Sequence, residues 1–275
     1  MSVFTEANRK AFDDLASSYD SKPWQITLSN QVASALRARK PQLGLRATAE
    51  PAHVRLLDYA SGTGAVTRAL GESVSCVRAI DISANMVARY NAAAREAGVS
   101  EEQAFAVEGD LFAAEVAEAL TAPQWYNFDV AVVALGFHHF EDPALAVKRL
   151  AERLVAATGV LAVVDFLPFE HEPGAQMQET IRQHGFTSAG LERVFKAGGL
   201  EDFKFEVLSE PAVLEDREGR KKERRVFIAT GRKAPTVWGK LAGWVGGLQD
   251  GVGGQMAMRP DQSGGGMFMP RKDAS

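Results

Sequence analysis

The sequence has a single cysteine, no long apolar run and no basic stripe. Because Cys76 is the only cysteine among 275 residues, an intramolecular disulfide framework and a cysteine-rich metal cage are excluded, which favours a reducing compartment. No run of about 18 uncharged apolar residues occurs, and the first residues do not form a basic segment followed by an apolar one. We therefore expect a cytoplasmic protein that does not enter a membrane.

The charge of the chain is small and evenly spread. Lys and Arg number 31 against 35 Asp and Glu, giving a formal net charge of -4. Because the basic residues are interspersed with acids, we expect no nucleic-acid partner. No H-E-x-x-H or C-x-x-C spacing is present, so no metal site is predicted. The 46% of hydrophobic residues can build one large core, and the oligomeric state is left open.

Short apolar runs alternate with amphipathic stretches through the middle of the chain. Such alternation predicts crossover units and a parallel sheet with helices on both faces. Capping residues support the helices, because Ser83 and the pair Asp142-Pro143 stand where helices would begin. The expected strands cover residues 54–59, 74–80, 104–107, 130–135 and 160–166, and the expected helices lie near 65–71, 83–97, 112–120 and 143–155.

The two ends of the chain differ from this middle part. Residues 1–40 are expected to form two helices broken near Lys22-Pro23, acting as a helical lid. Toward the other end, Thr187 or Ser188 begins a further helix, and strands at 203–208 and 225–230 are joined by a charged loop at 215–223. We predict one domain over 53–233 and a flexible Gly- and Met-rich tail over 234–275, whose tryptophans could alternatively contact a lipid surface or a partner.

A tight turn follows the first expected strand. Asp58 lies near the end of this strand, and Gly62-Thr63-Gly64 comes at the start of a helix, so the backbone can approach a ligand closely. About 20 residues later, Asp81 ends the second strand, where doubly wound folds place an acid that binds ribose hydroxyls. Together the two features predict a nucleoside site at the carboxyl edge of the sheet.

The run Leu56 to Gly64 resembles the first motif of class I S-adenosylmethionine (SAM)-dependent methyltransferases. Segments 79–86, 108–111 and 128–133 are similar to the motifs on the next three strands of that family. The resemblance implies an α/β, Rossmann-like, doubly wound sheet of seven mostly parallel strands, with an antiparallel last strand near 224–231. It also implies SAM as the cofactor.

The resemblance assigns roles to individual residues. It implies that Gly62 and Gly64 lie under the methionine part, that Asp81 holds the ribose, and that Asp110 with Leu111 faces the adenine. Each acid has an alternative: ordering the next helix for Asp58 and Asp81, or forming an ordinary turn for Asp110. Ala60 stands where the family often has glycine, which makes the turn conformation a point to examine. The predicted cofactor-binding set is Asp58, Ala60, Gly62, Gly64, Asp81, Ile82, Met86, Asp110 and Leu111.

Two histidines follow the fourth strand, where open α/β sheets present catalytic loops. An unperturbed imidazole titrates near neutral pH, so His138 or His139 is a candidate general base for an oxygen acceptor. Either could instead cap the next helix or pack beneath the cofactor. Tyr19 is placed near the methyl donor by the resemblance, or it belongs to a plain cover helix.

These features lead to one functional prediction and two alternatives. The chain is expected to transfer a methyl group from SAM to an oxygen, nitrogen or carbon of a small-molecule acceptor, similar to methyltransferases of quinone biosynthesis. One alternative is an NAD(P)-dependent oxidoreductase on the same sheet, although Thr67 stands where its third glycine would be. The other is a non-catalytic, SAM-binding regulatory partner.

Overall fold

The computed structural model describes residues 2–45, 53–170, 178–216 and 219–235. The predicted tail lies outside this part apart from residues 234 and 235, and so does segment 171–177, which follows the fifth strand. Among the described residues, no helix is long and apolar enough to cross a membrane.

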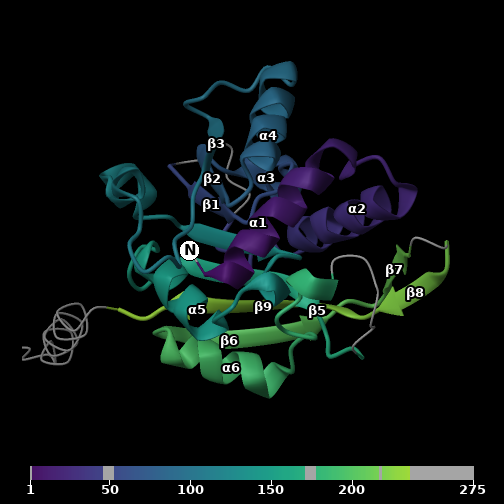
Figure 1. Cartoon of the computed structure of the whole chain (residues 1–275). Helices are drawn as coiled ribbons and strands as arrows, with labels where there is room; N and C mark the ends of the chain where they lie inside the picture. Colours follow the sequence, from purple (N-terminus) through teal and green to yellow (C-terminus); the bar gives the residue numbers. More distant parts are fainter. Residues whose placement is uncertain (1, 46–52, 171–177, 217–218, 236–275) are drawn as a thin grey trace, which may run out of the picture. The chain divides into compact units, whose positions relative to one another are not determined.

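Seven strands form one sheet in the order β3-β2-β1-β4-β5-β9-β6 (Figure 1). The pairs among β1 to β5 are parallel, whereas β9 runs antiparallel to both of its neighbours, β5 and β6. This confirms the predicted doubly wound sheet and its antiparallel last strand. The strands are β1 (Arg55–Tyr59), β2 (Cys76–Asp81), β3 (Ala104–Glu108), β4 (Val130–Ala134), β5 (Val160–Phe166), β6 (Leu200–Val207) and β9 (Val226–Lys233).

The helices begin at the residues that the capping pattern indicates. Ser83 accepts a hydrogen bond from the Met86 N–H at 3.1 Å, and Thr187 accepts one from Gly190 at 3.1 Å. Asp142 caps the helix that starts at Pro143. The helices are α1 (Val3–Leu15), α2 (Pro23–Ala38), α3 (Ala65–Leu70), α4 (Ala84–Glu96), α5 (Pro143–Glu152) and α6 (Ser188–Ala197), with short 3-10 turns η1 (Ala16–Ser18), η2 (Gly71–Ser73), η3 (Glu118–Thr121), η4 (Pro123–Trp125), η5 (Phe137–His139) and η6 (Gln178–Thr180).

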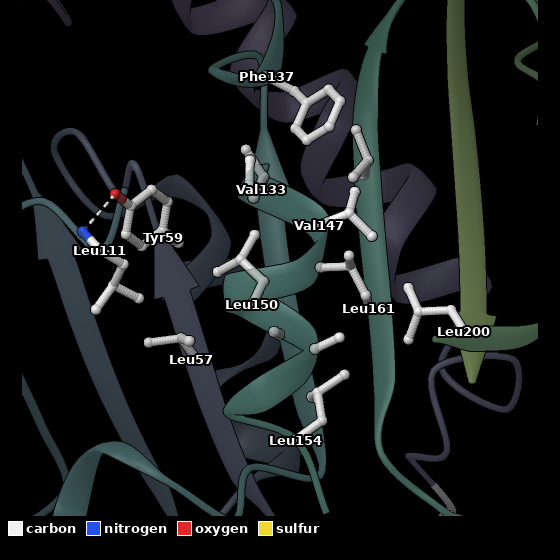
Figure 2. Close-up of a cluster of buried hydrophobic side chains, with 14 of the residues drawn as sticks. Leu57, Tyr59, Leu111, Val133, Phe137, Val147, Leu150, Leu154, Leu161 and Leu200 are labelled. Atoms are coloured by element: carbon white, nitrogen blue, oxygen red, sulfur yellow. Dashed lines mark hydrogen bonds between the residues drawn. The ribbon is translucent and has the colours of Figure 1, made fainter. Parts of the chain in front are cut away.

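Both faces of the sheet are buried, because successive residues of the central strands enter different cores. Leu57, Val133 and Leu161 pack with Val147 and Leu150 of α5 on one face (Figure 2). The neighbouring strand residues pack with α2 and α3 on the other face. Near-continuous apolar strands are what a parallel sheet covered on both sides requires. Because β1 to β5 run parallel, their carboxyl ends all lie at one edge of the sheet, where polar side chains can gather.

The helix expected over residues 112–120 is not formed, and that prediction was wrong. Asp110 accepts a hydrogen bond from the Phe112 N–H at 2.8 Å, a local turn that competes with helix formation. Downstream, Leu120 and Trp125 are buried from the separate 3-10 turns η3 and η4. The buried residues of this segment therefore come from two short turns and not from one face of a helix.

The charged loop expected between the last two strands contains an additional hairpin. Strands β7 (Ala212–Glu215) and β8 (Lys221–Arg224) pair antiparallel to each other, outside the main sheet. Strand β8 has no apolar residue and β7 has only four residues, so neither gives a periodic pattern that could be recognised from the sequence. Gln31 of α2 donates to the Glu210 carbonyl at 2.6 Å, which holds the start of this hairpin against α2.

Candidate active site

The turn after β1 has an unusual backbone. Ala60, Gly62 and Gly64 have φ angles of 55°, 51° and 93°, all in the left-handed region. An L-residue with a side chain is disfavoured there by about 1 kcal/mol, whereas glycine adopts this conformation readily. Ala60 therefore adopts a strained backbone conformation in this turn.

Asp81 holds this turn from the end of β2. One carboxylate oxygen accepts from the Gly62 N–H at 2.8 Å, and the other accepts from the Ser83 N–H at 2.9 Å. Burial raises the pKa of Asp81 to about 6. The side chain thus joins the glycine turn to the N-terminus of α4, and each carboxylate oxygen keeps a further lone pair for a ligand.

A cavity of about 660 Å³, which we call the first cavity, opens at this edge of the sheet. Its walls come from the strand ends, from α1 and from the segment after β4. Eight of the predicted site residues line it: Tyr19, Ala60, Gly62, Asp81, Ile82, Met86, Asp110 and His139.

The other predicted residues lie elsewhere. Asp58 lies outside the lining and accepts a hydrogen bond from the Thr67 hydroxyl of α3 at 2.8 Å. This contact fits the alternative in which Asp58 orders the helix that follows it. Burial raises the pKa of Asp58 to about 7. Gly64 begins α3 and is also outside the lining, with a Cβ added there 2.9 Å from the Tyr90 ring. Leu111 packs in the core, and its N–H donates to the Tyr59 hydroxyl at 3.2 Å (Figure 2).

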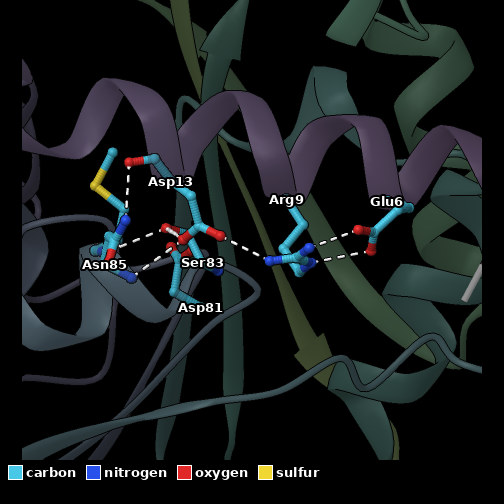
Figure 3. A network of polar contacts seen from close by, with 7 residues as sticks. Glu6, Arg9, Asp13, Asp81, Ser83 and Asn85 are labelled. Atoms are coloured by element: carbon cyan, nitrogen blue, oxygen red, sulfur yellow. Dashed lines mark hydrogen bonds and ion pairs between the residues drawn. The ribbon is translucent and has the colours of Figure 1, made fainter.

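Helix α1 is fastened over the first cavity by a chain of polar contacts. Asp13 accepts hydrogen bonds from the Ser83 hydroxyl at 2.6 Å and from the Asn85 N–H at 3.1 Å (Figure 3). Arg9 donates to the other Asp13 oxygen at 2.7 Å and pairs with Glu6. A carboxylate at the start of α4 is also favoured by the helix dipole. The contacts place α1 beside Asp81 and close that side of the cavity.

A smaller cavity of about 220 Å³, which we call the second cavity, lies next to the first. The two share a wall of four residues, two from the N-terminal helices and two from the segment after β4: Phe12, Tyr19, Leu135 and His139. The two cavities are therefore neighbours, with these four residues between them.

His138 lines the second cavity and not the first. Its Nδ1 lies 2.8 Å from one oxygen of Asp165, and its backbone N–H donates to the other oxygen at 3.0 Å. Asp165 is fully buried in β5. Since a carboxylate oxygen accepts, the proton of the neutral ring belongs on Nδ1 and the lone pair on Nε2. The pair therefore fixes both the orientation and the tautomer of His138.

The other two predicted catalytic residues are in different electrostatic states. His139 donates through Nδ1 to the Thr180 carbonyl at 2.7 Å, and burial together with neighbouring His138 lowers its pKa well below the ordinary value. Burial and the charges of Asp81 and Asp20 raise the pKa of Tyr19 to about 12. At neutral pH, Tyr19 is therefore a hydroxyl donor and His139 is an uncharged ring.

Comparison with known proteins identifies the domain. Residues 57–163 match the model of a family described as a methyltransferase domain. The fold and this match define a class I methyltransferase domain. Residues 57–163 thus form a SAM-dependent methyltransferase domain, which confirms the prediction from the strand-end motifs and sets aside the nicotinamide alternative. No curated protein matches the chain.

Solved structures share the fold at low sequence identity. The YcgJ protein of Bacillus subtilis is 16% identical with a TM-score of 0.56, covering 73% of this chain and 98% of its own. Magnesium protoporphyrin IX methyltransferase of Synechocystis, solved with bound SAM, is 16% identical with a TM-score of 0.55, covering 85% and 99%. The [4+2]-cyclase SpnF is 19% identical with a TM-score of 0.53, covering 74% and 82%. These similarities establish the architecture.

The residues at the first cavity fit a SAM molecule. A buried carboxylate at the wall, Asp81, suits two ribose hydroxyls, and Asp110 adds a second polar group beside the apolar side chains of Ile82 and Met86. Gly136 leaves room on the opposite wall, since a Cβ there would come within 2.8 Å of the Ala60 Cβ.

Several site residues were missed from the sequence. Asp165 could have been found, because it lies near the end of a buried apolar strand just as Asp58 and Asp81 do. Asn8 is buried on α1 at the first cavity, and its side-chain oxygen has no hydrogen-bond partner among the described residues. Nothing in the helical pattern of residues 3–15 marks Asn8, because its burial depends on what α1 covers.

Proposed function

We propose that this protein transfers the methyl group of SAM to a hydroxyl oxygen of a small, partly apolar molecule bound in the second cavity. The observation that carries the proposal is the orientation of His138 by buried Asp165 beside a cavity that shares a wall with the first one. Nitrogen and carbon acceptors do not all need a proton acceptor, whereas a hydroxyl group must lose its proton at some stage of the reaction. A positioned base therefore favours oxygen.

The donor side is assigned to the first cavity. Asp81 would hold the ribose hydroxyls, Asp110 the adenine, and the turn around Gly62 the methionine part. When bound, SAM supplies an electrophilic methyl group, and the electron pair of the broken carbon-sulfur bond remains on sulfur. Tyr19 and His139, which line both cavities, would align the methyl group of the donor with the oxygen of the acceptor.

The proton side is assigned to His138. The acceptor hydroxyl would donate to Nε2 of this ring and would pass its proton there as the new carbon-oxygen bond forms. Asp165 would keep the Nδ1 proton in place and stabilise the imidazolium that results. His139 is less suited to this step, because its pKa is lowered and its Nδ1 is committed to Thr180.

The first 40 residues act as a lid in this proposal. Asp13 ties α1 to the start of α4, and Asp20 accepts from the Thr63 hydroxyl at 3.0 Å, so the lid is attached to the donor turn at two points. Excluding water at the shared wall would strengthen the electrostatic interactions and protect the methyl donor from hydrolysis.

The test follows transfer of labelled methyl groups from SAM to small molecules of a cell extract, with products identified by mass spectrometry. Methylated hydroxyl compounds are the expected products of the wild type. His138→Gln should slow their formation by about 10² to 10⁴-fold while leaving S-adenosylhomocysteine binding unchanged. His139→Gln is the matched control and should retain more activity.

Three outcomes would contradict the proposal. Methyl incorporation only into nitrogen or carbon acceptors would remove the oxygen assignment. An unaltered rate in His138→Gln would remove the role of this base. Binding of S-adenosylhomocysteine without any methylated product would favour the regulatory alternative.

A further inference from the structure

The second cavity has mainly apolar and aromatic walls. Its lining includes aromatic rings from three separate elements and leucines from α2 and from the segment after β4, among them Phe12, Leu28, Leu135, Phe166 and Phe169. At about 220 Å³ it lies below the usual range for drug-sized ligand sites, which begins at about 300 Å³. Its size and walls suit a flat molecule of one or two fused rings.

The start of α2 brings three polar side chains to this cavity. Trp24 and Gln25 line it, and the Trp24 Nε1 and the Gln25 Oε1 are buried with no hydrogen-bond partner among the described residues. Lys22 precedes them and lines the same cavity. A buried donor or acceptor left without a partner costs about 1 to 3 kcal/mol, so a ligand that pairs with these groups gains that energy.

The charged residues around the cavity favour an anion. Cations come from Lys22 and from Lys222 and Arg224 of the hairpin, against Glu215 and Asp216. Asp216 is paired with Arg220, 2.7 Å away, and Lys222 and Arg224 also have interaction partners, so we assign the binding of the anion to Lys22. Arg224 lies over the Phe169 ring at 3.8 Å, which places its positive charge beside an aromatic wall. Apolar walls strengthen each of these charge interactions.

Building on the proposed function, we propose that the methyl acceptor is a flat aryl compound that carries a carboxylate in addition to the hydroxyl group that is methylated. Lys22 and the Trp24 N–H bind the carboxylate. His138 receives the hydroxyl group in the same cavity. The N-terminal end of α2 thus selects the acceptor, while the strand ends select the donor.

Three naphthalene compounds of similar size test this assignment: 6-hydroxy-2-naphthoate, neutral 2-naphthol and 6-amino-2-naphthol. Titration calorimetry on the full chain, with and without S-adenosylhomocysteine, gives the dissociation constant of each compound. The naphthoate should bind about tenfold or more tightly than 2-naphthol, as expected for a charge-assisted hydrogen bond. The amino compound has no carboxylate, so it should bind less tightly than the naphthoate.

Three variants locate the preference. Lys22→Gln should reduce the advantage of the naphthoate to about twofold without changing 2-naphthol binding. Trp24→Phe keeps the ring and removes only the N–H, so it should lower naphthoate binding alone. Lys40→Gln removes a charge beyond the opposite end of α2, outside the cavity lining, and should change neither.

Equal binding of the three compounds, binding of none of them, or a naphthoate preference that survives Lys22→Gln would overturn the inference. Because these titrations require no methyl transfer, their failure leaves the proposed function standing when S-adenosylhomocysteine still binds. Loss of S-adenosylhomocysteine binding would instead count against the proposed function.

Discussion

The two cavities of this protein are built in different ways. The first is formed by α1 and by residues at the ends of the strands β1 to β4, where turns and acidic residues follow each strand in chain order. The second is assembled from the start of α2, the segment after β4, the end of β5 and the β7-β8 hairpin, which are far apart along the chain. The contrast shows that the donor side is set by local backbone chemistry and the acceptor side by long-range packing.

The largest effect is expected at Asp165, the buried acid of the acceptor side. Asp165→Asn replaces one oxygen by an NH₂ group, which must then face either the His138 ring nitrogen or the His138 N–H. The ring loses its fixed tautomer, and kcat should fall by about 10² to 10⁴-fold. Calorimetry should show unchanged S-adenosylhomocysteine binding. Parallel loss of binding and rate would mean that Asp165 only supports the fold.

A smaller effect is expected at the donor side, where Asp81 and Asp58 can be compared directly. Asp81→Asn removes the charge from the hydrogen bonds to a ribose and should weaken S-adenosylhomocysteine binding by about 10 to 100-fold. Asp58→Asn is the matched control, because Asp58 lies outside the cavity lining and should leave binding within about threefold. Equal losses in both variants would contradict the assignment of the first cavity.

Asp58 should also affect the pH dependence of stability. Its pKa is raised by burial from 3.8 to about 7, so the folded state holds this proton more tightly than the unfolded state. The stability it contributes is full below about pH 4 and is lost as pH rises toward 7, by at most about 1.4 kcal/mol per pH unit. Urea unfolding from pH 4 to pH 8 should show a smaller loss for Asp58→Asn than for the wild type. Parallel curves would contradict burial of a protonated acid.

The smallest effect concerns the wall between the donor turn and the segment after β4. A methyl group added by Gly136→Ala would come within 2.8 Å of the Ala60 Cβ, so this variant should lose about 1 kcal/mol of unfolding free energy. Ala60→Gly removes both the clash and the strain at φ 55°. The double variant should therefore recover most of the loss in a double-mutant cycle. Additive effects would show that the two residues do not touch.

The same contrast explains what could be predicted from the sequence. The sheet, its antiparallel last strand and the caps at Ser83 and Asp142 follow from periodicity, short-range capping patterns and the family resemblance. The left-handed turn at Ala60 was flagged because alanine replaces a frequent glycine. The failure of the 112–120 helix was missed because the local turn made by Asp110 does not show in the periodicity, and the β7-β8 hairpin was missed because β8 has no apolar residue. The unpaired groups of Trp24 and Gln25 are visible only once α2 is placed.

A crystal structure of the complex with S-adenosylhomocysteine is the most direct test of the central claim, that donor and acceptor occupy separate cavities joined at Tyr19 and His139. The account predicts the nucleoside in the first cavity, with its ribose hydroxyls within hydrogen-bonding distance of Asp81 and its sulfur directed toward the shared wall. A nucleoside bound in the second cavity, or one that makes no contact with Asp81, would contradict it.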